Sequence, residues 1–127
     1  MKKSQFIKIL SDFEVVETPM TWNDARKYCQ VINRDLASIQ NEVEHDKLMA
    51  AIKSGSWSWW IGLTDEEEEG KWLWSDGREV TFTSWHSGYP NWGTRGNCAH
   101  LYVYSKKWFD HPCYYQNSFV CRITSGW

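Results

Sequence analysis

Four cysteines constrain this chain more than any other feature: Cys29, Cys98, Cys113 and Cys121. No two of them form a C-x-x-C pair, the spacing typical of zinc sites and thioredoxin-like redox sites. An even number of cysteines without such pairs favours two disulfides, which persist in oxidising, extracellular compartments. Spacing alone leaves all three connectivities open. The alternative is four buried free thiols in a cytosolic protein.

Length and charge exclude several classes of protein. The 127 residues suit one domain, which we expect to span residues 1–127. The net charge of −2 and the lack of a basic block argue against a nucleic-acid partner. No apolar stretch reaches the roughly 18 residues of a membrane span, so no membrane insertion is expected. We expect a secreted protein, or an ectodomain fragment of a larger one.

Helices are expected early in the chain and strands late. Thr21 and Asn41 are each followed, three positions later, by an acidic residue, the pattern of a capping box at the start of a helix. The second helix is expected to end near Gly55. Short strands are expected over residues 6–16, 36–39, 57–63, 71–74, 98–104, 108–110 and 119–123. Helices followed by an antiparallel sheet indicate an α+β domain.

One long segment has no regular pattern. Residues 75–97 are rich in glycine and aromatic residues and show no sustained hydrophobic period. An irregular segment of this length inside a small domain is normally functional.

Four motifs follow one another along the chain: the helix at residues 21–29, Asp35 to Ile39, Trp60-Ile61-Gly62-Leu63, and the pair Cys113 and Cys121. In this order they resemble the animal C-type lectin-like domain, over nearly the whole chain. The short form is most similar, because the extra N-terminal cysteine pair is missing. The resemblance implies a C-type lectin-like fold with two helices, antiparallel sheets, a long loop and the disulfides Cys29–Cys121 and Cys98–Cys113.

The family's usual function is sugar binding through calcium, and here the chain departs from the pattern. The family takes its ligands from Glu-Pro-Asn or Gln-Pro-Asp, a Glu before the third Cys, and Trp-Asn-Asp. This chain has Tyr89-Pro90-Asn91, Gly96 and Trp108-Phe109-Asp110. Only Asn91 and Asp110 remain as ligands, whereas calcium takes about six to eight oxygens. We expect calcium binding to be weak or absent at this primary position.

An acidic turn offers a second candidate metal site. Residues 65–69 are all acidic, and the turn resembles the auxiliary calcium site of collectins. Asp65 and Glu69 match ligand positions, and Asn97 stands where the family has an Asp. These three residues are the candidate metal ligands; the alternative is a solvated acidic turn.

Aromatic residues stand at or beside the positions of the missing ligands. Flat rings with a polar tip suit either sugar stacking or a protein hot spot. Trp85, Trp108 and His100 are expected to pack in the interior instead. The candidate ligand-binding residues are therefore Tyr89, Asn91, Trp92, Phe109 and Asp110.

Two functions remain open. In the first, this is a non-catalytic extracellular domain that binds a glycan or glycoprotein through residues 85–110, with calcium weak or absent and no other cofactor. In the second, it has lost sugar binding and takes a protein receptor on the same face. An exposed ring at Trp57 or Trp59 would mark a homodimer contact. No G-x-S-x-G, H-E-x-x-H or P-loop occurs, so an enzyme is not expected.

Overall fold

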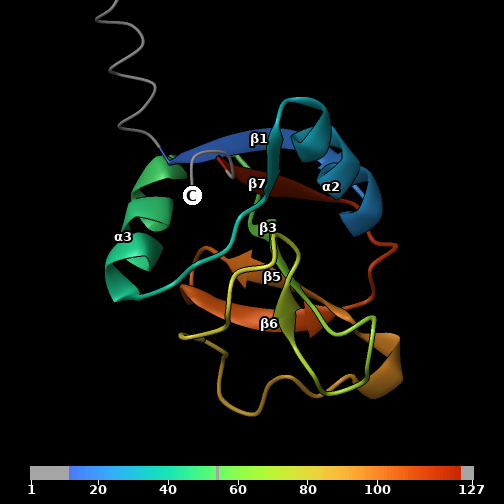
Figure 1. Cartoon of the computed structure of the whole chain (residues 1–127). Coiled ribbons are helices and arrows are strands. Elements are labelled where there is room, and N and C mark those ends of the chain that lie inside the picture. Colours follow the sequence, from blue (N-terminus) through green and yellow to red (C-terminus); the bar gives the residue numbers. More distant parts are fainter. Residues whose placement is uncertain (1–11, 54, 124–127) are drawn as a thin grey trace, which may run out of the picture.

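Two helices and a mixed sheet make up the structure (Figure 1). It is a computed structural model that describes residues 12–53 and 55–123. The elements in chain order are β1 (Phe13–Met20), α2 (Trp22–Val31), β2 (Arg34–Leu36), α3 (Glu42–Ala51), β3 (Ser58–Thr64), β4 (Leu73–Trp74), the 3-10 turn η1 (Gly93–Arg95), β5 (Cys98–Tyr102), β6 (Lys107–His111) and β7 (Asn117–Ile123). The predicted α+β class and the helix–sheet order are confirmed.

The strands form one sheet in the order β1-β7-β3-β5-β6, with β2 on β7 and β4 on β3. All pairings are antiparallel except β3 with β7, which run parallel with Trp60 beside Phe119. The sheet is therefore mixed rather than antiparallel throughout, because the last strand inserts between β1 and β3. Of the strand expected over residues 6–16, residues 6–11 lie outside the described residues, and β1 continues to Met20.

Both helices begin where the sequence predicts. The Thr21 hydroxyl accepts a hydrogen bond from the backbone N–H of Asp24, and the Asn41 side chain accepts one from that of Glu44. These caps satisfy amides that have no partner within the helix. The Glu44 carboxylate accepts from the backbone N–H of Gln40 and pairs with Arg122 on β7 at 2.7 Å, so it also ties α3 to the sheet.

Both predicted disulfides are present. Cys29–Cys121 joins α2 to β7, and Cys98–Cys113 joins the start of β5 to the segment after β6. They close loops of 92 and 15 residues. Chain-entropy arguments give about 4–5 kcal/mol of stabilisation for the first and about 3 kcal/mol for the second. The second disulfide anchors both ends of the β5–β6 segment, which carries Phe109 and Asp110 of the candidate site.

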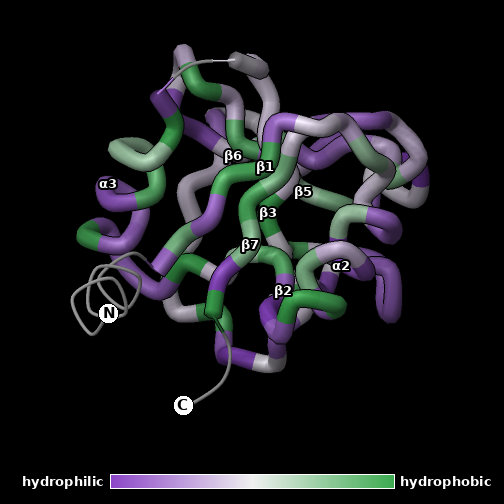
Figure 2. Tube along the Cα trace, turned by 90° about the horizontal axis from the view of Figure 1, so that it is seen from above, coloured by the Kyte–Doolittle hydropathy of each residue, from purple (hydrophilic) through white to green (hydrophobic). Residues whose placement is uncertain are grey.

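The core lies on both sides of β3, whose alternate side chains enter two hydrophobic clusters. Trp59, Ile61 and Leu63 pack beneath α3, whereas Trp60 packs with Trp22 on α2. Figure 2 shows the hydrophobic residues concentrated along the central strands. A side chain at Gly62 would meet the carbonyl oxygen of Leu36 at 2.8 Å, so the Trp-Ile-Gly-Leu motif needs its glycine for close packing.

The long loop lies at the end of the sheet opposite β1 and β7 (Figure 1). Residues 75–92 form no helix, and their only strand-like contact is an isolated bridge between Trp85 and Trp108. Trp85 and Trp108 pack on the core, as predicted. Of the helices that the structure describes, none is long and apolar enough to cross a membrane.

Candidate functional site

Alternating side chains of β5 and β6 separate the core from an aromatic face. Leu101 and Trp108 point into the core. Their neighbours His100 and Phe109, paired across the two strands, lie on the other face. The long loop folds over this face.

A hollow of about 460 Å³ opens on this face. We call it the Phe109 hollow; its lining residues are Ser58, Tyr89, Trp92, His100, Tyr102, Phe109, Asp110 and His111. Four of the five candidate ligand-binding residues therefore line one cavity. The fifth, Asn91, is exposed beside it. The volume of the hollow falls in the range of about 300–1,000 Å³ that is usual for small-molecule sites.

Phe109 is held among other rings. His86 stacks on it with centroids 4.9 Å apart, His100 lies nearly parallel to it at 5.7 Å, and Tyr89 meets it edge-on at 4.6 Å. Packing on several sides orders the ring before any ligand arrives, which lowers the entropic cost of binding.

Asp110 is buried and its carboxylate is already satisfied. It is 1% exposed, and it accepts hydrogen bonds from the backbone N–H of Asn91 (3.0 and 3.1 Å) and of Trp92 (2.7 Å). These amides present positive dipoles to the carboxylate where, by resemblance, a calcium ion would lie. The residues at the primary calcium position therefore do not fit the ion, and Asp110 holds the loop instead.

Gly96 belongs to the same arrangement. A side chain at this position would have its Cβ 2.4 Å from the Cβ of Trp92 and 3.3 Å from a carboxylate oxygen of Asp110. The glutamate that the family carries here would clash with Trp92. The replacement of Glu by Gly and the presence of Trp92 are therefore coupled.

The acidic turn differs from a fully solvated one. Asp65 is 2% exposed and accepts from the backbone N–H of Gly70 at 2.8 Å. Its other oxygen and the side-chain oxygen of Asn97 are buried without a hydrogen-bond partner. Burial raises the pKa of Asp65, and desolvation together with the charge of Asp65 raises the pKa of the exposed Glu69. These two oxygens, one from the Asp65 carboxylate and one from the Asn97 amide, fit a cation in part, with fewer ligands than calcium prefers.

Two other groups of potential metal ligands in the described part of the chain contain none of the predicted residues. Within residues 12–53 and 55–123 they are Glu66 with Cys98 and Cys113, and Glu42 with His45 and Asp46. The two cysteines are oxidised to a disulfide. Nε2 of His45 accepts a hydrogen bond from the indole N–H of Trp108. Neither group is the auxiliary site expected from the sequence.

Sequence reasoning missed part of the Phe109 hollow. Tyr102 lines it, and His100, which was expected only to pack, is 9% exposed yet reaches the lining. Burial and the neighbouring His111 lower the pKa of His100 to about 4, so this ring is neutral near pH 7. The alternation of residues 98–104 was the available signal, because it places His100 and Tyr102 on one side of the strand.

Of the two tryptophans considered for a surface contact, Trp57 is 62% exposed, whereas Trp59 is fully buried. Trp57 contacts Tyr104, which is 70% exposed, with ring centroids 6.1 Å apart. This pair lies outside the lining of the Phe109 hollow. The homodimer contact remains a prediction.

The fold and the two disulfides together define a C-type lectin-like domain. The chain belongs to the Lectin C-type domain family, which matches residues 18–123. It is a non-enzymatic domain, as expected.

Similar proteins span several activities. The chain is 39% identical to human lithostathine-1-beta over 84% of this chain and 68% of that protein, and 35% identical to chicken hepatic lectin over 81% and 50%. The human lithostathine crystal structure superposes with a TM-score of 0.82 at 34% identity, covering 87% of this chain and 81% of that one. The carbohydrate-recognition domain of cow CD23, solved in the presence of a GlcNAc2Man3 oligosaccharide, has a TM-score of 0.78 at 31% identity, covering 86% and 84%.

Proposed function

We propose that this domain is a secreted, non-catalytic glycan-binding module whose ligand enters the Phe109 hollow with little or no dependence on calcium. The observation that carries the proposal is the pairing of a satisfied Asp110 with a hollow lined by rings. A metal bridge to sugar hydroxyls has no free carboxylate here, whereas ring stacking has several partners.

The lining supplies both interactions that a sugar needs. The C–H face of a pyranose is apolar and stacks on flat aromatic rings, while its hydroxyls require donors and acceptors. Tyr89 and Tyr102 each offer a ring with a hydroxyl, and Phe109, which stacks with His86 and His100, packs against both tyrosines.

The names of several relatives support glycan binding. The cow CD23 structure was solved with an oligosaccharide, and other relatives are called lectins. The herring type II antifreeze protein has the same fold, with a TM-score of 0.81 at 26% identity. One scaffold therefore hosts different ligands, and the residues of the site decide which ligand a given chain binds.

Calcium has a lesser role in this proposal. Asp65, Glu69 and Asn97 would hold an ion at the acidic turn, where it would neutralise buried oxygen atoms. This position is separate from the lining of the Phe109 hollow. The ion would stabilise the turn and would not lie in the Phe109 hollow.

A protein receptor or a second copy of the chain is the other candidate partner. The exposed rings Trp57 and Tyr104 favour it, because aromatic side chains are enriched in the cores of protein interfaces. A receptor on the Phe109 hollow would use the same rings as a sugar.

A glycan array separates these functions when it is read once with calcium and once with a chelator. If the proposal holds, the protein binds the same defined set of glycans on the array with calcium and with the chelator. Phe109→Ala should abolish retention, whereas Tyr104→Ala, a matched aromatic change outside the hollow, should preserve it. Retention that disappears with the chelator, or an array without any binding, would overturn the proposal.

A further inference from the structure

A second and larger hollow lies on the other side of Trp92. Its volume is about 640 Å³, and its lining residues are Thr21, Asn23, Glu66, Trp92, Thr94, Arg95, Asn97, Pro112, Cys113, Tyr114 and Tyr115. We call it the Tyr114 hollow. Trp92 is the one residue in the linings of both hollows, so its side chain forms the ridge between them.

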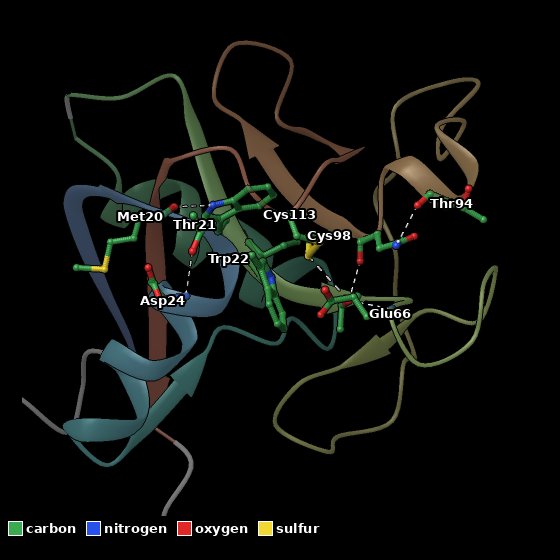
Figure 3. Close-up of a disulfide and its surroundings, with 12 residues drawn as sticks. Met20, Thr21, Trp22, Asp24, Glu66, Thr94, Cys98 and Cys113 are labelled. Atoms are coloured by element: carbon green, nitrogen blue, oxygen red, sulfur yellow. Dashed lines mark hydrogen bonds between the residues drawn. A yellow bond between two sulfur atoms is a disulfide. The ribbon is translucent and has the colours of Figure 1, made fainter.

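The walls of the Tyr114 hollow are fixed by bonds between distant parts of the chain. The backbone N–H of Trp22 donates to the carbonyl of Cys113 at 3.0 Å, and the Cys98–Cys113 disulfide ties the same segment to β5. Figure 3 shows this disulfide between the first turn of α2 and Glu66, with Thr94 beyond. The Asn97 side chain donates to the Thr94 carbonyl at 3.2 Å. A hollow built in this way exists before its ligand binds.

The lining combines rings with uncharged polar groups. Tyr114 and Tyr115 are 74% and 46% exposed. Asn23 is exposed on the first turn of α2, and Thr94 is exposed in η1. Such a surface offers stacking faces beside amide and hydroxyl groups, the combination that recognises a neutral polyhydroxyl compound.

Charge on the lining is balanced. Glu66 and Arg95 are its two ionised side chains, one of each sign. The Arg95 guanidinium lies over the Trp92 ring, 5.4 Å from its centroid, and so stiffens the ridge. The two charges offset each other, so the lining has no net charge that would favour an anionic or a cationic ligand.

Aromatic contacts cross the ridge without a break. The His111 ring, in the Phe109 hollow, lies 5.4 Å from Trp92 and 4.4 Å from Tyr115, which lines the Tyr114 hollow. The ring of Tyr114 is the next in this row of aromatic contacts, with its centroid 5.1 Å from that of Tyr115. A linear ligand has ring faces to follow from one hollow into the other.

We propose that the Tyr114 hollow is a second sugar subsite and that the ligand of this domain is a neutral oligosaccharide lying across Trp92. This inference rests on the proposed glycan-binding function and specifies the length and charge class of the ligand. One sugar unit occupies the Phe109 hollow, and a neighbouring part of the same chain occupies the Tyr114 hollow.

Calorimetry with oligosaccharides of one to six units provides the test. The probes are the neutral chito-, cello- and manno-oligosaccharide series together with GlcNAc2Man3. Affinity should rise with chain length until both hollows are filled. Tyr114→Ala and Asn23→Ala should each weaken the longer probes roughly three- to tenfold and leave the monosaccharide unchanged. Tyr104→Ala is the control with an exposed tyrosine outside both hollows.

The outcomes distinguish the two proposals. Binding that is lost in Phe109→Ala but is independent of chain length and unchanged in Tyr114→Ala refutes the second subsite and leaves the proposed function intact. Absence of binding by every probe, or binding that survives Phe109→Ala, overturns both. Loss of oligosaccharide binding in Tyr114→Ala supports the second subsite only if this variant has the same melting temperature as Tyr104→Ala. If Tyr114→Ala does not fold, the result for Asn23→Ala decides instead.

Discussion

The indole Nε1–H of Trp108 donates a hydrogen bond to Nε2 of His45 at 3.1 Å, with both residues buried. The bond joins α3 to β6, the strand that carries Phe109 and Asp110. An indole nitrogen is a donor only, so Nε2 of His45 must be unprotonated. Protonation of His45 therefore removes a link between a helix and the strand beneath the candidate site.

Acid should destabilise the domain between about pH 6.5 and 4. Burial lowers the pKa of His45, of His111 and, to about 4, of His100. The unfolded chain then binds more protons than the folded one, so stability is lost as pH falls through this range. The shift at His100 corresponds to roughly 3 kcal/mol. Melting temperatures measured from pH 7 to 4 should fall.

Charged groups near these histidines also shift their pKa values. Glu42 and Asp46 favour protonation of His45 and Lys107 opposes it, while Asp110 faces His111. The raised pKa values of Asp65 and Glu69 act in the opposite sense, because their stabilising effect is lost as pH rises. His100→Gln removes one histidine and should flatten the curve. A wild-type melting temperature that is constant or rises on acidification contradicts the prediction.

The Cys29–Cys121 disulfide should contribute more stability than Cys98–Cys113. It closes a loop of 92 residues rather than 15, which restricts the unfolded chain more. Replacing each pair by alanine should cost about 4–5 and about 3 kcal/mol respectively in urea unfolding. Equal losses would show that strain or residual structure outweighs chain entropy.

Asp110→Asn should destabilise the long loop. The amide retains one oxygen for the backbone N–H groups of Asn91 and Trp92 but turns an NH2 toward them in place of the second oxygen. Unsatisfied buried donors cost about 1–3 kcal/mol. Chemical denaturation of this variant measures the loss, and hydrogen exchange at the two amides should accelerate. Asp24→Asn, on an exposed first helical turn, is the matched control, and an equally small effect at both sites would refute the role of Asp110.

Calcium at about 1 mM should change the melting temperature only slightly. The acidic turn supplies Asp65, Glu69 and Asn97, and such an undersupplied site binds at about millimolar or worse. Stabilisation is then about 0.4 kcal/mol when concentration equals Kd. Asp65→Asn should remove even this response, whereas Glu67→Gln, a change at an exposed carboxylate of the same turn, should not. Tight calcium binding to the wild-type protein in calorimetry would be the contrary result.

Local patterns determined much of the fold in advance. Caps at Thr21 and Asn41 depend on side chains within a few residues of the amides they satisfy, so sequence alone locates the helix starts. The spacing of the cysteines indicated disulfides, and only the family resemblance indicated their pairing. The same resemblance indicated the candidate ligand face, because the aromatic residues at positions 89, 92 and 109 each replace or adjoin a calcium ligand of the family.

Tertiary structure alone decided what the polar residues of the site do. The same sequence is compatible with an Asp110 that faces solvent, yet the loop closes so that two backbone amides occupy its carboxylate. Asp65 is buried, and Trp92 lies between the two hollows, because residues far away in the chain pack around them. The physical reason is that the burial and the hydrogen-bond partners of a loop residue depend on how distant segments pack around it. A local sequence pattern carries no record of those contacts.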